Sequence, residues 1–295
     1  MGYNAFRRRR GMQYCAPPPA YWKLTVQTTG VSQDFAVNIY AGSSVSITID
    51  WDDGSAPVLY NTTGIKTCTY AAAGTYYPKI SGSIVDGYIR IGIDADTRGR
   101  LKATAPIGGV TGLKSFSQAF YGCTGLKSLP GDLFRYNTLV STEGFDRTFY
   151  GCTGLKSLPV DLFRHNTLVS TIGFSQTFRG CTGLTSLPTD LFKYNTLVST
   201  QGFYRTFYGC NKLTLNPWIF YASGEESTRF ASPVPTPDFA GCFQLTGAFT
   251  GAKGTAPALW DCTFNGAPTT TNCFTGHSAA SVDNYGDIPT AWGGA

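Results

Sequence analysis

The sequence predicts a β-rich protein in two parts, a small antiparallel β-sandwich followed by a solenoid of short strands and short helices. Three near-identical copies of one 29-residue unit, which begin at Gly122, Gly151 and Gly180, indicate the solenoid. Repeats of this length stack so that each unit buries its apolar face against its neighbours. Short alternating runs of apolar and polar residues before the repeats indicate the sandwich. The composition agrees, because only 14% of the residues are charged while glycine and aromatic residues are plentiful.

Residues 1–20 are predicted to form a basic, proline-rich arm, because four arginines and three prolines run consecutively there and cannot bury a core. The candidate residues for anchoring this arm to a larger acidic assembly are Arg7, Arg8, Arg9 and Arg10. A solvated tail and nucleic acid binding are the alternatives. The four arginines account for most of the net charge of +5, so the rest of the chain offers no large basic face to a nucleic acid backbone.

Residues 21–95 are predicted to form the antiparallel sandwich. Alternating runs at 22–26, 35–39 and 45–49 have the period of half-buried strands. Glycines punctuate this segment, and we expect a turn at each of them. They are Gly42, Gly54, Gly64, Gly74 and Gly82.

Two segments, IDWDDGS at 49–55 and TYAAAGTY at 69–76, resemble a PKD-type domain. That family has an aromatic-Asp-x-Gly-Asp-Gly turn and a later Tyr-x-x-x-Gly-x-Tyr strand, and this chain lacks the first glycine of the turn. The resemblance implies an immunoglobulin-like spacer or adhesion module. Asp50, Asp52 and Asp53 suggest calcium, but the ligand order of a calcium loop is missing. We therefore expect these aspartates to bond backbone N–H groups in a turn.

Residues 96–216 are predicted to form the repeats. Leucines at 126, 129 and 133 indicate a strand and a turn, with Asn137 placed to bond backbone in the following bend. Phe145 and Phe149 are four residues apart, which predicts a short helix with both rings facing the core. The recurring string FYGCTGL resembles the F-x-G-C-x-x-L hallmark of BspA-type leucine-rich repeats, over about residues 112–250. The resemblance implies a right-handed leucine-rich-repeat solenoid, as in surface proteins and phage proteins.

Four of the nine cysteines occupy the same position of successive repeats. They are Cys123, Cys152, Cys181 and Cys210. Equivalent positions in a solenoid stack about 4.8 Å apart, so we expect a packed column of buried thiols. Disulfides and a metal site are the alternatives. The sequence has no C-x-x-C pair, which is the usual zinc and redox spacing.

Residues 217–295 are predicted to be degenerate repeats and a C-terminal cap, because echoes of the repeat motif recur there with altered spacing. We expect Trp218, Trp260 and Trp292 to cover the exposed end of the array. A sugar-stacking role for one of these rings is the alternative.

The sequence contains no recognisable catalytic constellation. His165 stands where the neighbouring repeats carry Tyr136 and Tyr194, and His277 belongs to no nucleophile or metal motif. No glycine-rich phosphate loop follows a predicted strand. We therefore expect no enzymatic activity, no cofactor and no bound metal.

Residues that differ between otherwise identical repeats are the candidates for a partner-binding surface, because packing against identical neighbours fixes the core positions. Tyrosine and arginine, which are common anchors of interfaces, are frequent among them. The alternative is that these differences arose by drift at solvent-exposed positions that have no function. The candidates are Tyr136, His165, Tyr194, Asp146, Arg147, Tyr150, Gln176, Arg179, Tyr204, Arg205 and Tyr208.

The two resemblances predict a non-enzymatic structural protein of a tailed-phage virion, a capsid decoration, head fibre or tail fibre that presents an adhesive solenoid. We expect it on the virion surface, bound to other virion proteins through the arm and to a host surface glycan or protein through the solenoid. No secretory signal is recognisable, and reduced cysteines suit a chain folded in the cytosol. No membrane span and no nucleic acid partner are expected, and homo-oligomer formation is left open. The alternatives are a BspA-type adhesin on the bacterial cell surface and the accessory binding region of a carbohydrate-active enzyme.

Overall fold

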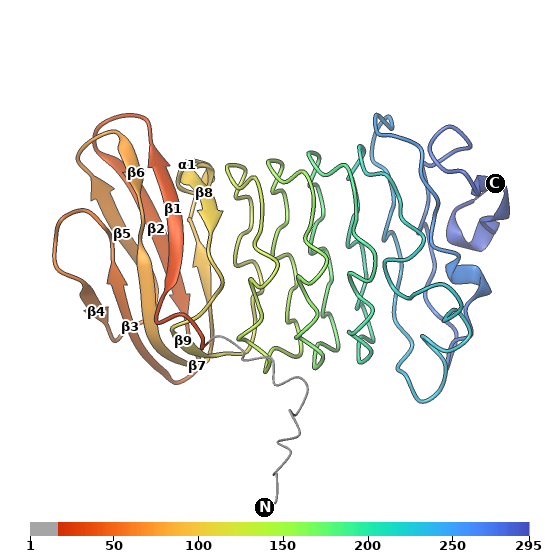
Figure 1. Ribbon diagram of the computed structural model, residues 1–295, viewed down its shortest axis with the longest axis horizontal. Coiled ribbons are helices and arrows are strands. Elements are labelled where there is room, and N and C mark those ends of the chain that lie inside the picture. Colours follow the sequence, from red (N-terminus) through yellow and green to blue (C-terminus); the bar gives the residue numbers. More distant parts are fainter. Residues whose placement is uncertain (1–16, 295) are drawn as a thin grey trace, which may run out of the picture.

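A computed structural model describes residues 17–294 as an elongated body with a β-sheet at one end and stacked coils of chain at the other (Figure 1). The described chain is β-rich with little helix, which confirms the predicted class. Its strands are β1 (Trp22–Thr28), β2 (Gln33–Tyr40), β3 (Ser44–Asp50), β4 (Val58–Tyr60), β5 (Gly64–Tyr70), β6 (Gly74–Tyr76), β7 (Lys79–Ile91), β8 (Leu101–Thr104) and β9 (Val110–Leu113). Its helices are α1 (Ala95–Arg100) and the short 3-10 turns η1 (Leu259–Asp261), η2 (Tyr285–Asp287) and η3 (Thr290–Trp292).

Strand β7 is the centre of the sheet. Its first half pairs with β3 and its second half with β2, both antiparallel. β9 adds to it as a parallel neighbour. The sheet interior is built by the alternation in the sequence, since Leu24, Ile39, Ile47 and Ile89 are buried while their chain neighbours are more accessible.

Gly82 lies inside β7, so the expected turn at this residue was wrong. It pairs with Ile47 of β3 and with Val110 of β9, and its φ is +121°. Glycine within a strand marks a place where another backbone approaches closely. Here the close neighbour is the backbone of β3, since an added Cβ would lie 3.1 Å from Ile47 Cα.

The aspartates after β3 form the expected turn. Asp50 accepts a hydrogen bond from the backbone N–H of Asp52 at 3.0 Å, and Asp52 accepts one from the N–H of Tyr77 at 2.8 Å. Asp53 accepts from both the N–H and the hydroxyl of Ser55. These bonds hold the pKa of Asp53 below its usual value. The carboxylates are therefore engaged in fixing the loop.

The sheet continues into the coils without a break. β8 and β9 lie beyond the predicted end of the sandwich at residue 95, yet β8 pairs with β1 and β9 with β7. The Trp22 ring packs edge-on against Phe120 of the first coil, at a centroid distance of 5.8 Å. The N–H of Ile91, at the end of β7, donates to Ala119 O at 2.8 Å. One hydrophobic core thus runs through both parts.

The coils are built from turns, and the expected short helices and regular strands are not found between residues 114 and 258 of the described chain. Successive backbone N–H groups donate alternately to the next coil and to their own coil. The N–H groups of Phe145 and Arg147 donate to Gly173 O and Ser175 O of the next coil, whereas the N–H of Asp146 donates to Glu143 O of its own coil. Each coil is thereby hydrogen-bonded to the next like a strand in a parallel sheet.

The helix prediction failed because every fourth residue of this segment has a positive φ. The values are +52° at Glu143, +51° at Arg147 and +68° at Gly151. A right-handed helix requires negative φ throughout and bonds each N–H to the carbonyl four residues earlier. The turn pattern nevertheless repeats every four residues, so Phe145 and Phe149 both face the core as expected.

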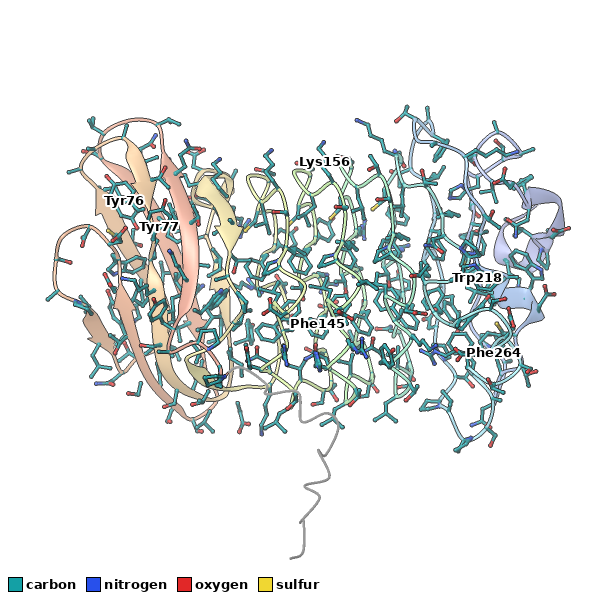
Figure 2. All side chains as sticks on the ribbon, viewed as in Figure 1. Tyr76, Tyr77, Phe145, Lys156, Trp218 and Phe264 are labelled. Atoms are coloured by element: carbon teal, nitrogen blue, oxygen red, sulfur yellow. The ribbon has the colours of Figure 1, made fainter. Side chains whose placement is uncertain are left out.

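Phenylalanines from successive coils stack into columns that fill the interior (Figure 2 labels Phe145 there). In one column, Phe120, Phe149, Phe178 and Phe207 lie 5.2 to 5.4 Å apart by ring centroids with nearly parallel planes. Burial of each ring contributes about 1.5–3 kcal/mol. Because the contacts are to neighbouring coils, no coil is stable by itself.

Polar side chains in the interior also form columns, and each donates to a backbone carbonyl of the preceding coil. The Cys152 and Cys181 thiols donate to Phe120 O and Phe149 O, both at 3.0 Å. Asn166 Nδ2 donates to Asn137 O at 2.9 Å. The cysteine column was expected. Asn166 and Asn195 bond the backbone of the previous coil, whereas at Asn137, the same position of the first repeat, the sequence predicted a bond to backbone in the following bend. The described cysteines are free thiols.

Because the thiols are buried, the free energy of unfolding should fall as the pH rises into the alkaline range. Burial raises the pKa of Cys123 and of Cys210 to about 12, whereas an unfolded cysteine titrates at roughly 8.5. Below the pKa of the unfolded chain, the thiols are protonated in both the folded and the unfolded state, so their titration takes nothing from the free energy of unfolding. Between about pH 9 and 12 only the unfolded chain ionises, so each thiol costs about 1.4 kcal/mol of stability per pH unit. In urea unfolding under reducing conditions, the free energy of unfolding of Cys210→Ala should therefore fall less steeply with rising pH than that of the native chain. The same pH dependence in both proteins would contradict this prediction.

The C-terminal segment closes the stack. Trp292 is buried against Phe239 and Phe264, and Trp218 and Trp260 are half-buried against the same core, as expected for residues that cover the end. Figure 2 labels Trp218 and Phe264 at this end. The asparagine column ends at Arg229, a buried arginine. Its Nη2 donates to Phe192 O at 3.1 Å and to Asn195 O at 3.2 Å, as an asparagine of a further coil would.

Candidate binding groove

A polar groove of about 700 Å³ runs across the coils on the side of residues 142–147. It begins at Tyr88 of β7 and crosses four successive coils of the stack. Each coil contributes residues directly before, within or just after its Phe-x-x-x-Phe motif, at 115–118, 142–147, 172–179 and 201–205. A smaller hollow of about 170 Å³ continues from Tyr204 and Arg205 to the next coils. We call the first of these the variable groove.

The turn pattern of the coils places the variable side chains in this groove. Phe145, Thr148 and Phe149 are buried and the same in all three repeats, while Asp146 and Arg147 between them line the groove and change from copy to copy. The inward positions are fixed by stacking against identical neighbours. The outward positions therefore decide what each coil offers to a ligand.

Asp146 is the most buried charged group of the groove. Its side chain belongs to a residue only 5% exposed, and its Oδ2 accepts from Arg147 Nη1 at 2.9 Å. Burial raises the pKa of this carboxyl, while the Arg147 charge and the Ser175 hydroxyl partly offset the effect. At Oδ1 no donor of the described chain meets hydrogen-bonding geometry. Oδ1 is itself buried, so Asp146 does not offer this oxygen to the open part of the groove.

Two arginines of the groove are held by stacking on tyrosines. The Arg179 guanidinium lies 4.6 Å from the ring centroid of Tyr208 and 5.5 Å from that of Tyr150, and its Nη1 donates to Gln176 Oε1 at 2.8 Å. Arg205 lies 4.9 Å from the Tyr204 ring and 5.1 Å from the Tyr208 ring. These contacts fix the planes of both guanidinium groups.

The structure brings most of the predicted surface residues together. Of the candidates, the groove itself is lined by Asp146, Arg147, Gln176, Arg179, Tyr204 and Arg205. Tyr150 and Tyr208 border it through their contacts with Arg179. The remaining three, Tyr136, His165 and Tyr194, do not line it. Tyr136 borders a different hollow, beside Pro19 and Leu139. The candidate anchoring residues Arg7 to Arg10 lie outside the described residues.

Sequence reasoning missed the first part of the groove, Tyr88 with Ser115, Ser117 and Gln118. The signal was present, because 116–123 (FSQAFYGC) aligns with 145–152 (FDRTFYGC) and so marks one more coil before the first full repeat. Tyr88 carries no such signal. It reaches the groove because β7 runs beside the first coil.

Neither histidine lines the variable groove. His277 is buried and contacts Ser281 Oγ at 3.1 Å and Phe243 O at 3.0 Å, and burial lowers its pKa to about 4. His165 is exposed. Across residues 17–294, no three His, Cys, Asp or Glu side chains are placed to hold a metal ion. Within that range, no helix has the length and apolar character needed to cross a membrane.

No protein-family model matches the chain, and no curated protein or solved structure matches it either.

Proposed function

We propose that this protein is a non-enzymatic adhesive component of a tailed-phage virion, a decoration or fibre protein that holds a partner in the variable groove. In this proposal the sheet is a PKD-like sandwich and the coils are a BspA-type leucine-rich-repeat solenoid. The observation that carries the binding role is that four of the eight positions at which the repeats differ, 143, 146, 147 and 150 with their counterparts, line or border one groove.

Exposure alone does not account for where the repeats differ. Thr138 and Leu139 are exposed in the first repeat, and their counterparts are exposed in the other two, yet all three copies have the same residues there. At Asp146, by contrast, the copies carry an acid, a serine and a tyrosine. Drift at solvated positions does not explain this change, because Asp146 and Ser175 are buried. A ligand that contacts successive coils differently explains the changes in the groove, whereas those at Gly131, Val160 and Thr189 lie outside it.

The thiol chemistry favours a chain that folds in a reducing compartment. Seven of the eight free cysteines of the described chain are buried, and those of the central column bond backbone carbonyls. Such columns form most safely where disulfides are kept reduced. Virion proteins are made in the host cytosol and assembled there, which supports the virion over a classically secreted adhesin.

Immunogold electron microscopy of the source culture and its lysate tests this proposal. With an antibody raised against the coils, we expect label on the heads or tails of phage particles. Antibody pre-adsorbed with the purified chain is the control and should remove the label. Label confined to cell envelopes, with bare particles, would overturn the virion assignment in favour of the bacterial adhesin.

A further inference from the structure

We infer that the ligand of the variable groove is an acidic polysaccharide, whose anionic groups bind Arg179 and Arg205. This inference rests on the proposed binding function and names the chemistry of its partner. Two observations carry it: the unpaired guanidinium groups, and the composition and repeat of the groove lining.

The guanidinium groups are prepared for anions. Neither Arg179 nor Arg205 has a carboxylate partner in the part of the chain that the structure describes, whereas Arg147 is paired with Asp146. Both unpaired groups are oriented by tyrosine rings, and Tyr208 contacts the two of them. A guanidinium whose plane is already fixed loses little entropy when it forms a bidentate pair with a carboxylate or sulfate.

The lining favours a saccharide over a protein or a nucleic acid. Ile172 is the one aliphatic side chain among the lining residues of the groove, so a protein partner would find no apolar centre. The tyrosine faces are occupied by guanidinium groups, which leaves little for nucleobases to stack on. The coils repeat at roughly the 4.8 Å spacing of hydrogen-bonded strands, close to the length of one sugar ring. Successive sugars of an extended chain can therefore meet successive coils.

The test is a glycan array probed with the full chain and with the double variant Arg179→Tyr/Arg205→Gln. Both substitutions place residues that other repeats already carry at these positions, Tyr150 and Gln176, so the coils should keep their fold. The array carries uronic-acid, sialic-acid, sulfated and neutral oligosaccharides. We expect retention of acidic members only, weakened at least about tenfold in the double variant and by raising salt from about 0.05 to about 0.5 M. Arg164→Gln, which removes an exposed arginine outside the groove, is the matched control and should bind normally.

Three results would overturn the inference: binding of neutral glycans as strong as that of acidic ones, acidic binding unaffected by the double variant, or no glycan bound at all. The proposed function is tested separately by the particle labelling. Gold on virions together with an empty array would retain the virion protein and reject the polysaccharide. Glycan binding without gold on virions would retain the ligand and reject the location.

Discussion

Gly82→Ala is expected to destabilise the protein by at least about 4 kcal/mol, enough to leave little folded chain. The reason is twofold. The φ of Gly82 is +121°, a conformation that residues with a Cβ rarely adopt. In addition, the new Cβ would overlap Ser46 O and lie 3.0 Å from the Ser46 carbonyl carbon, in the backbone of β3. A side chain can move aside, but a strand paired along its length with β7 cannot. Thermal and urea unfolding measure the loss.

Gly64→Ala is the matched control, because it separates backbone strain from overlap. Gly64 also has a positive φ, +97°, but an added Cβ there would meet no atom within 4 Å. Its substitution should therefore cost only the strain, about 1 kcal/mol. Equal losses at Gly64 and Gly82 would show that strain alone matters and that the close approach of β3 to β7 contributes nothing.

The sequence predicted the β-rich class and the inward-facing residues because both follow from periodicity. Alternation marks a half-buried strand whatever its partners are, and the spacing of Phe145 and Phe149 puts both rings on one side of any conformation that repeats every four residues. What periodicity does not reveal is the conformation itself. A four-residue repeat fits a helix and a series of turns equally well at this length, and positive φ at Arg147 decided for turns.

The functional surface could be predicted only in part for a related reason. Differences between repeats identify outward positions, and half of these positions lie at one groove around Asp146, Arg147 and Arg205. The same comparison also selected Tyr136, which lies at a different hollow, because a list of variable positions contains no information on which side of a coil each one faces. Contacts between different elements, such as Tyr88 of β7 beside the first coil, leave no mark in the repeats.

The end of the asparagine column shows how a local departure from the repeat has a physical reason. Each coil of the central stack bonds its neighbour through Asn166 or Asn195, and the next coil lacks an asparagine at that place. Without a substitute, the carbonyls of Phe192 and Asn195 would face an apolar core. Arg229 reaches them from a residue outside the repeat, and its Nε also donates to Phe220 O at 2.8 Å. The degenerate segment therefore still supplies hydrogen-bond donors to the backbone carbonyls of the last full repeat.

Arg229→Met is consequently expected to destabilise the protein by about 3 kcal/mol or more. Burial lowers the pKa of Arg229 to about 10, which corresponds to about 3 kcal/mol spent on holding the charge inside. Against this stand three charge-assisted hydrogen bonds of about 1.5–3 kcal/mol each. Methionine avoids the first cost but leaves three buried carbonyls with fewer donors, so the net change is a loss. Hydrogen exchange should locate the loss in the last coils, while Arg164→Met, an exposed arginine paired with Asp161, should change stability by less than about 0.5 kcal/mol. A variant at position 229 as stable as the native chain would mean that the carbonyls find other donors.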